Sequence, residues 1–344
     1  MMNVVFHSSD YFSPVLSVSM VSILENNRDL DKISFYVIEN KITEAHKQML
    51  KSMVGSYANG QLIFIPMPDI NKNFKLGLKM IKSIWLFDSY CRLFLGTILP
   101  NSVERVLYLD CDTLCQGSLK EFYNTDLKGY CCAGVADCLS EKYYKLFDMD
   151  ECSRYCNSGM VLFDLNIWRE NKMEEMVARY VREQNGYVFF MEQSVMNIVL
   201  QNRIKIMHPK FNTYTLMVEF TYENLYRLRQ SKRFYTNEEI VEAIVSPVII
   251  HLTNSFYIKG RPWIEGNKHP YNKLFMYYRQ MTPWKDVPLF PDKTPWSHRV
   301  LNKVIRLLPQ SFVCSCVGWI YNQWRPAHIE SVTVRQKKIL NAYV

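Results

Sequence analysis

The chain has 344 residues, of which 48% are apolar and 14% aromatic. This length allows one large or two modest domains, and the apolar content excludes disorder as the general state of the chain. The net charge of +8 is concentrated at one end, because residues 293–344 hold eight Lys and Arg against one acid, Glu330.

Neither a secretory leader nor a membrane-spanning helix is expected. The opening MMNVVFHSSDYFSP predicts a strand from the start and lacks the basic and apolar regions of a leader. The longest apolar candidate, residues 312–321, is too short to cross a bilayer. The ten cysteines include no C-x-x-C pair, which favours reduced, structural thiols. We therefore expect a cytoplasmic protein.

Strands and helices alternate from the first residues onward. Apolar runs predict strands at residues 3–9, 33–39 and 61–66. Helical periodicity predicts helices between them, at residues 13–27 and from Thr43 onward. Strands separated by single helices are typical of a parallel α/β sheet.

The alternation continues to about residue 265. The later predicted elements are a helix around 84–98, strands at 105–110, 131–137 and 158–165, helices at 168–184 and 192–201, and a last buried strand at 248–252. Prolines and aromatic residues multiply after Trp263. We therefore expect an α/β domain at residues 1–265 and a basic, aromatic C-terminal extension at residues 266–344.

Two aspartates, Asp110 and Asp112, follow the apolar run VLYL. Ligands of parallel α/β sheets gather beyond the carboxyl ends of the strands, and residues two apart in an extended segment point the same way. Two carboxylates that point the same way can bind a divalent cation, which can also bind the phosphate oxygens of a substrate. An Asp at a strand end is also a common turn residue, but the buried run before this pair favours a functional site.

Several chemistries remain open for this pair. The motif DCDTL resembles that of haloacid-dehalogenase-type phosphatases, in which Asp110 would be the nucleophile, but the late D-D or G-D-x-x-x-D pattern of those enzymes does not occur. A nucleotidyltransferase would need a Gly-rich loop after its first strand, and FHSSDYFSP has no glycine. A D-x-D pair that holds a metal on a nucleotide-sugar diphosphate fits better, in a glycosyltransferase or in a non-catalytic sugar-nucleotide binder.

Further polar candidates follow the later strands and helices. We expect Asn157 and Ser158 in a turn before a strand, and Glu192 and Gln193 at a helix start. Turn formation and capping are the ordinary roles of such residues. His251 ends the last buried strand, where a neutral imidazole would be a good Mn²⁺ ligand, although a lone histidine is more often structural. Lys259 and Arg261 follow it and would suit a diphosphate.

Seven stretches in this order carry a family resemblance: FHSSDY, SYCRL, YLDCDTL, GVADC, CNSGMVLFDLNIWR, MEQSVMN and IHLTNSFYIKGRPW. Together, across residues 3 to 265, they resemble the family 8 glycosyltransferases. These are retaining enzymes of the GT-A fold and include bacterial galactosyl- and glucosyltransferases of lipopolysaccharide and capsule synthesis. The resemblance implies a Rossmann-like α/β domain, with a mixed, mostly parallel sheet flanked by helices.

The resemblance also implies roles for individual residues. A Mn²⁺ (or Mg²⁺) ion would be bound by Asp110, Asp112 and His251 together with the diphosphate of a UDP-sugar. His7, Ser9 and Tyr11 would contact the uridine of the UDP-sugar, and Arg92 would also contact the UDP-sugar. Asp137, Asn157 and Ser158 would face the transferred sugar. Lys259 or Arg261 would hold the leaving diphosphate. Gln193 matches the residue beside the anomeric carbon, and Glu192 stands where the family has Asp.

The implied reaction moves galactose or glucose to a cell-surface glycan or a lipid-linked oligosaccharide. A metal and a cationic clamp would stabilise the charge that develops on the leaving diphosphate. Retention by double displacement would need a carboxylate nucleophile, whereas Gln193 is an amide. We therefore expect the acceptor hydroxyl to attack from the face that the diphosphate leaves.

The basic tail has two interpretations. Residues 297–308 place Arg299, Lys303 and Arg306 along one side and apolar residues along the other. Such a segment fits peripheral docking on an anionic membrane through residues 293–344, and it also fits a helix packed on the domain with a solvated basic face. No nucleic-acid-binding module accompanies the charge, so nucleic acid is not an expected partner.

Overall fold

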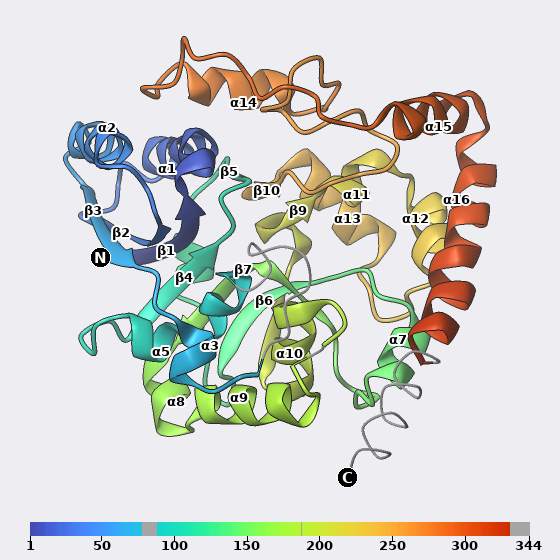
Figure 1. The fold of residues 1–344 in the computed structure, drawn as a ribbon, viewed down its shortest axis with the longest axis horizontal. Helices are drawn as coiled ribbons and strands as arrows, with labels where there is room; N and C mark the ends of the chain where they lie inside the picture. Colours follow the sequence, from blue (N-terminus) through green and yellow to red (C-terminus); the bar gives the residue numbers. More distant parts are fainter. Residues whose placement is uncertain (78–87, 187, 331–344) are drawn as a thin grey trace.

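The computed structural model describes residues 1–77, 88–186 and 188–330, and a seven-stranded sheet forms its centre (Figure 1). The strand order is β3-β2-β1-β4-β7-β6-β8. The strands are β1 (Met2–Ser9), β2 (Ile33–Asn40), β3 (Gly60–Pro66), β4 (Arg105–Leu109), β6 (Cys132–Ala136), β7 (Cys156–Asp164) and β8 (Ile204–Met207). Only β7 runs antiparallel to its neighbours, so the predicted mixed, mostly parallel sheet is confirmed.

A smaller sheet of three strands stands beside the first. It consists of β5 (Thr113–Cys115), β10 (Ile249–His251) and β9 (Thr213–Tyr214), with β10 in the middle. The strand predicted at 248–252 therefore exists, but it belongs to this separate sheet. Because β10 pairs antiparallel with β5, His251 lies opposite Thr113, directly beside Asp112.

Helices cover both faces of the main sheet. Alternate residues of one strand serve the two faces: Val4 and Phe6 join the core that includes α1, whereas Val5 joins the core that includes α9. The helices are α1 (Ser13–Asn26), α2 (Glu44–Gly55), α3 (Ile70–Asn73), α5 (Leu95–Ile98), α6 (Lys120–Tyr123), α7 (Glu141–Leu146), α8 (Leu165–Glu170), α9 (Met173–Glu183), α10 (Met191–Val199), α11 (Thr215–Glu219), α12 (Tyr222–Arg229), α13 (Asn237–Val245), α14 (Asn272–Arg279), α15 (Trp296–Leu307) and α16 (Gln310–Trp319).

Two predicted helices differ from the structure. The first part of the helix predicted at 84–98 lies outside the described residues, and the rest is a 3-10 helix, Ser89–Leu93, followed by α5. The helix predicted at 168–184 is interrupted, because Lys172 has a left-handed φ of 52° between α8 and α9. Helical periodicity alone does not reveal such a break.

The chain beyond residue 265 packs partly on the first domain. Phe275 and Tyr278 of α14, Trp284, and Cys314 of α16 join the core that includes α1. Helix α15, in contrast, has no buried residue. A domain boundary at residue 265 stays a prediction. Among the described residues, no helix has the length and apolarity needed to span a bilayer.

Glu219, at the end of α11, gives a prediction on stability. Burial raises the pKa of Glu219. Hydrogen bonds from Ser255 and the Ile258 N–H lower it, but the effect of burial is larger and the pKa is about 7. Since the unfolded carboxyl has a pKa near 4.5, the folded state binds more protons between these values, and the free energy of unfolding falls as pH rises through this window. Glu219→Gln should therefore stabilise the chain at pH 8 by on the order of 1–3 kcal/mol and have little effect at pH 5.

Urea unfolding at both pH values measures this difference. Glu151→Gln, at an exposed glutamate, is the matched control and should change stability equally little at each pH. A Glu219→Gln variant that is no more stable than wild type at pH 8 would contradict the prediction.

Candidate active site

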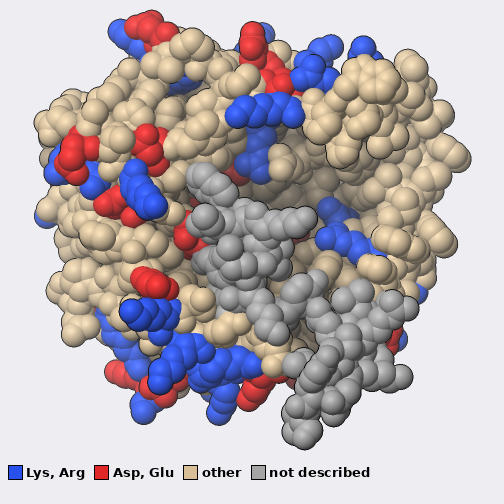
Figure 2. Space-filling model, in the orientation of Figure 1, with Lys and Arg blue, Asp and Glu red and all other residues tan. Residues whose placement is uncertain are grey.

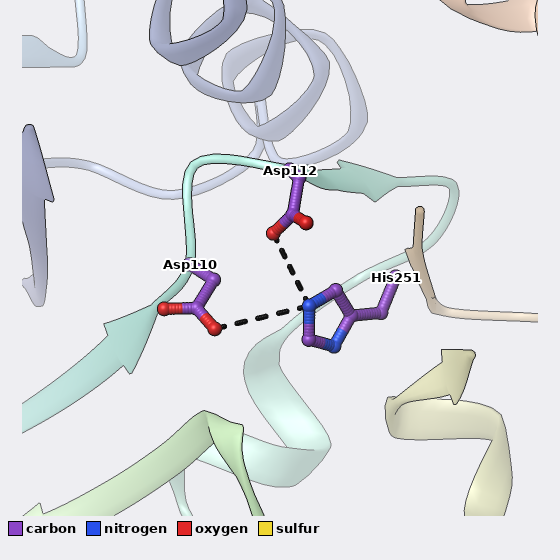
Figure 3. Close-up of side chains that lie close together, drawn as sticks. All are labelled: Asp110, Asp112 and His251. Atoms are coloured by element: carbon purple, nitrogen blue, oxygen red, sulfur yellow. Dashed lines mark ion pairs between the residues drawn. The ribbon is translucent and has the colours of Figure 1, made fainter. Parts of the chain in front are cut away.

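The two sheets meet at Asp110 and Asp112. Strand β4 ends at Leu109 and β5 begins at Thr113, so the aspartates lie in the short link between them. Asp110 N–H donates to the carbonyl of Gly159 in β7 (2.8 Å), which fixes the link to the main sheet. Figure 3 shows both carboxylates pointing toward His251 of β10. His251 Nε2 lies 3.2 Å from Asp112 Oδ1 and 3.8 Å from Asp110 Oδ2.

This cluster fits a divalent cation. One potential ligand atom from each of the three residues lies within 4.8 Å of the others. Gly159 leaves room beside them: a Cβ at this position would lie 2.1 Å from His251 Cε1 and 2.9 Å from Asp110 Oδ2. Carboxylate oxygens with an imidazole nitrogen form a donor set that suits Mn²⁺. The structure thus brings together the three residues that the sequence proposes as metal ligands.

Charge interactions shift the pKa values of Asp112 and His251 in opposite directions. Burial alone would raise the pKa of Asp112, but His251 and Arg261 outweigh it and hold that pKa at about 2. Burial alone would lower the pKa of His251, but the charge of Asp112, its hydrogen bond and the charge of Asp110 raise it above the ordinary value. A divalent cation held by Asp110, Asp112 and His251 would add positive charge beside these carboxylates.

Arg92, in the 3-10 helix after residue 88, lies on the other side of Asp110. Its guanidinium donates to Asp110 Oδ1 (3.0 Å) and to the carbonyl of Ser158 (2.8 Å). It lies over the ring of Tyr108, 4.4 Å from the ring centre, and Tyr108 OH also donates to Asp110 Oδ1 (3.0 Å). Arg92 therefore orients a proposed metal ligand; its predicted contact with the donor stays a prediction.

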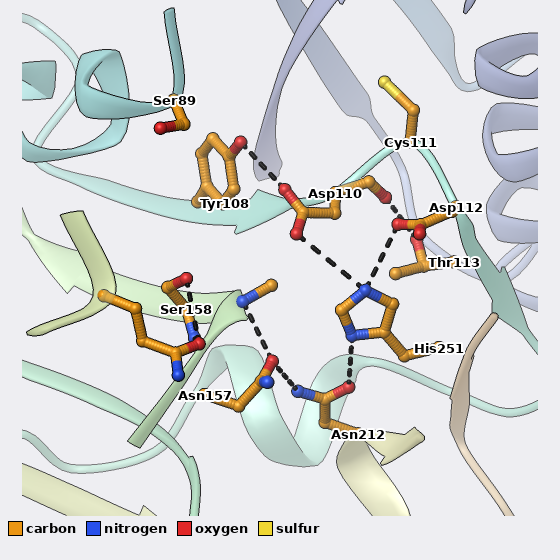
Figure 4. A network of polar contacts seen from close by, with 12 residues as sticks. Ser89, Tyr108, Asp110, Cys111, Asp112, Thr113, Asn157, Ser158, Asn212 and His251 are labelled. Atoms are coloured by element: carbon orange, nitrogen blue, oxygen red, sulfur yellow. Dashed lines mark hydrogen bonds and ion pairs between the residues drawn. The ribbon is translucent and has the colours of Figure 1, made fainter. Parts of the chain in front are cut away.

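A hydrogen-bonded group of side chains follows along β6, β7 and α10; Figure 4 shows its β7 members, Asn157 and Ser158. Asp137, one residue after β6, accepts from Gln193 Nε2 (3.0 Å) and from Asn157 Nδ2 (3.3 Å). Gln193 Oε1 in turn accepts from Ser158 N–H (3.0 Å). The four residues that the family resemblance assigns to the transferred sugar and to the anomeric carbon are therefore neighbours.

Glu192 stands at the start of α10 after an unusual backbone. The two preceding residues, Phe190 and Met191, both adopt left-handed conformations with φ of 57° and 52°. Such conformations are costly for residues other than glycine and cluster at functional sites. Glu192 accepts a hydrogen bond from Ser89 (2.7 Å) and lies 3.7 Å from Arg92, so its carboxylate is held close to Asp110.

The predicted uridine loop lies at the end of β1. Within the described residues, His7 Nε2 and Ser9 Oγ are buried without a hydrogen-bond partner, and His7 Nε2 lies 3.8 Å from Asp88. Tyr11 is 49% exposed and stacks on Phe290 with ring centres 4.3 Å apart. Unpaired buried polar atoms next to an exposed aromatic ring are consistent with a site for a base.

The two basic residues that follow β10, Lys259 and Arg261, lie in different places in the structure. Arg261 Nη1 donates to Asp112 Oδ2 (2.8 Å), which brings its positive charge to the metal cluster. Lys259 Nζ instead points toward Gly266, where an added Cβ would lie 3.3 Å away. Of the alternatives that the sequence left open, Arg261 is the residue beside the carboxylates.

Sequence reasoning missed three residues of the site. Asn212 accepts from the ring of His251 through its Oδ1 and donates to Asn157 through its Nδ2. Tyr108 orients Asp110, and Gly159 provides the space between His251 and Asp110. No local pattern distinguishes these residues from ordinary strand and turn positions.

Comparisons with known proteins agree with the fold. The sequence profile of Glycosyl transferase family 8 matches residues 3–264. The lipopolysaccharide 1,2-glucosyltransferase of Escherichia coli (strain K12) is 26% identical over 83% of this chain and 79% of that protein. The lipopolysaccharide 1,3-galactosyltransferase of Salmonella typhimurium is 21% identical over 88% of this chain and 84% of that protein.

Other matches are shorter or purely structural. A Haemophilus influenzae relative is 30% identical, but the match spans 61% of this chain and 63% of that protein. The crystal structure of the galactosyltransferase LgtC with donor and acceptor sugar analogs has a TM-score of 0.66 at 21% identity, over 87% of this chain and 99% of that one. This likeness shows the GT-A fold. The chain is a member of glycosyltransferase family 8.

Proposed function

We propose that this glycosyltransferase moves a hexose, galactose or glucose, from a UDP-sugar to a cell-surface glycan, with retention of configuration and with Mn²⁺ as cofactor. The carrying observation is the cluster of Asp110, Asp112 and His251 beside the group formed by Asp137 and Gln193. The lipopolysaccharide glucosyl- and galactosyltransferases among the relatives support the choice of sugar and acceptor. Family membership argues against the phosphatase alternative.

The charged residues suit a leaving diphosphate. When bound, a divalent cation would neutralise the diphosphate oxygens and stabilise the charge that develops as the glycosyl bond breaks. Asp110, Asp112 and His251 would hold it, and Arg261, already 2.8 Å from Asp112, would add a second positive charge at the same place. His7, Ser9 and Tyr11 would hold the uridine.

The sugar-side residues favour attack by the acceptor from the face that the diphosphate leaves. Gln193 is held at both ends, by Asp137 and by Ser158, and an amide is a poor nucleophile. Glu192 carries a carboxylate, but Ser89 and Arg92 hold it. The acceptor hydroxyl would therefore lose its proton to the leaving phosphate oxygen. A trapped glycosyl–enzyme on Glu192 would contradict this part of the proposal.

The experiment that tests the proposal is UDP release from a panel of UDP-sugars, with Mn²⁺ or EDTA and without acceptor. Slow, metal-dependent hydrolysis of UDP-galactose or UDP-glucose would support it and identify the donor. A non-catalytic binder would bind UDP but would produce no UDP from any UDP-sugar, even when a lipopolysaccharide acceptor is added. Metal-independent release, or release only from other nucleotide sugars, would contradict the proposal.

We further propose that the chain acts at the cytoplasmic face of a membrane and docks there through its tail. Helix α15 turns its apolar side outward: Trp296 is 79% and Leu307 85% exposed. On its basic side, Arg306 packs on the chain, because its Nε donates to the carbonyl of Tyr257 (2.6 Å). In Figure 2 the surface over α15 and α16, at the upper right, is mostly without charged residues.

Helix α16 extends this apolar surface. Val313, Cys314 and Gly318 pack against the domain, whereas the outward side exposes Phe312 and Trp319. Packing on the domain and docking on a membrane are therefore compatible, because the residues that pack and the residues that are exposed are different ones. Lys293, Arg299 and Lys303 are exposed next to the apolar residues, and this combination suits an anionic bilayer. Residues 331–344 of the proposed segment lie outside the described part of the chain.

Vesicle flotation measures this docking. The full chain should bind vesicles that contain phosphatidylglycerol and bind neutral phosphatidylcholine vesicles weakly. The double variant Trp296→Ser, Leu307→Ser should lose at least about tenfold in affinity, because it removes inserted apolar surface. The matched control is Val245→Ser with Tyr277→Ser, at residues that are 74% and 58% exposed elsewhere. Equal loss in both double variants would contradict docking through α15.

A further inference from the structure

We propose that Asn212 is a positioning residue for His251, and that it links the metal cluster to the sugar pocket through a relay of hydrogen bonds from Asp137 through Asn157. The inference rests on the proposed function of the cluster as a metal site. Asn212 would contact neither the proposed cation nor the sugar directly; it contacts His251 and Asn157. The relay is drawn in Figure 4 from Asn157 through Asn212 to His251.

The first step of the relay fixes the orientation of Asn157. Asp137 Oδ2 accepts hydrogen bonds from two amide nitrogens, that of Gln193 and that of Asn157, the latter at 3.3 Å. The amide oxygen must then point the other way. There it accepts from the backbone N–H of Gly159 and from Asn212 Nδ2, both at 3.0 Å. The Gly159 N–H is a donor that cannot reverse, so it confirms this orientation independently.

The second step transfers the orientation to the histidine. Because Asn212 uses its nitrogen toward Asn157, its oxygen faces His251 Nδ1, at 3.1 Å. An amide oxygen accepts, so Nδ1 must carry a proton. The other ring nitrogen, Nε2, is the one that faces Asp110 and Asp112. Asn212 therefore presents Nε2 to the position between the carboxylates, which is how a metal-binding histidine is usually oriented.

The backbone makes this arrangement rigid. Asn212 has no exposed surface. It follows the 3-10 helix Pro209–Phe211 and immediately precedes β9, whose Tyr214 pairs with His251 itself. The side chain that orients the ring and the strand that carries the ring are therefore held by the same small sheet. A buried amide with both ends bonded leaves the ring little freedom to rotate.

The test measures Mn²⁺ affinity alone, by calorimetry, without nucleotide or sugar. Asn212→Ala should weaken Mn²⁺ binding by about 10- to 100-fold, as loss of a residue that orients a metal ligand does. Asn212→Asp keeps an acceptor opposite Nδ1 and should restore affinity to within about threefold of wild type. The matched control is Asn27→Ala, at an asparagine that is equally buried and whose side chain bonds to Ile23 and Leu119 rather than to His251.

A second readout needs no metal. In the metal-free chain, proton NMR should show a slowly exchanging, downfield Nδ1–H resonance of His251, because the Asn212 oxygen accepts this proton. It should persist in Asn212→Asp and Asn27→Ala and be lost in Asn212→Ala. Wild-type Mn²⁺ affinity in Asn212→Ala, equal loss in Asn27→Ala, or no protected Nδ1–H in wild type would overturn the relay. A wild-type chain that binds no Mn²⁺ would contradict the proposed function, while the NMR readout would still decide the relay.

Discussion

Replacing Asp112 with Asn should abolish sugar transfer. Asp112 is the residue of the cluster that contacts both His251 Nε2 (3.2 Å) and Arg261 Nη1 (2.8 Å). The amide removes a negative charge and one proposed metal ligand, and with them several kcal/mol of stabilisation of the leaving diphosphate. A loss of about 4 kcal/mol corresponds to a fall of roughly 10³-fold in kcat/KM.

The measurement is UDP release from the preferred donor, together with Mn²⁺ affinity of the same preparation. Asp29→Asn is the matched control, because it removes an aspartate of an exposed pair with Lys120 and should leave both quantities unchanged. The prediction fails if Asp112→Asn keeps wild-type metal affinity and turnover, since the carboxylate would then serve only the fold.

Gly159→Ala should have a comparable effect without changing any charged or polar group. An added Cβ would lie 2.1 Å from His251 Cε1 and 2.9 Å from Asp110 Oδ2, and such contacts force the ring and the carboxylate apart. Because displacement of reacting groups by about 1 Å costs on the order of 10²-fold in rate, we expect at least that loss in kcat/KM. Mn²⁺ binding should weaken in parallel.

Gly55→Ala is the matched control for this substitution. Gly55 ends α2, and an added Cβ there meets nothing within 4 Å. Alanine is a better helix former by up to about 1 kcal/mol, so this variant should be as active as wild type and at least as stable. Full activity with unchanged metal affinity in Gly159→Ala would show that the space beside His251 is not needed.

Much of the fold and part of the site follow from local sequence. The run VLYL before Asp110 predicts a buried strand, and the two-residue period of strands places Asp110 and Asp112 on one side of its end. Both expectations agree with β4 and the link that follows it. The alternation of apolar strands and amphipathic helices likewise predicted a parallel sheet, because single helices that cover a sheet connect parallel strands. The antiparallel β7 did not follow from that alternation.

The tertiary structure decided how distant residues meet. Nothing near His251 in the sequence indicates that β10 leaves the main sheet and pairs with β5, yet this pairing alone puts the imidazole beside Asp112. The tertiary structure also decided that Arg261, and not Lys259, faces the carboxylates, and that Asn212 faces the imidazole ring of His251. These contacts depend on long-range packing, which leaves no periodic pattern in the chain.

The tail shows the same division. Its sequence determined an amphipathic, basic helix, because the spacing of Arg299, Lys303 and Arg306 fixes which residues share a side. Only the tertiary structure decided which of these residues face outward: Arg306 bonds to Tyr257, whereas Trp296 and Leu307 are left exposed together with Arg299 and Lys303. Periodicity specifies the faces of a helix, but the neighbours against which it packs determine which face the solvent meets.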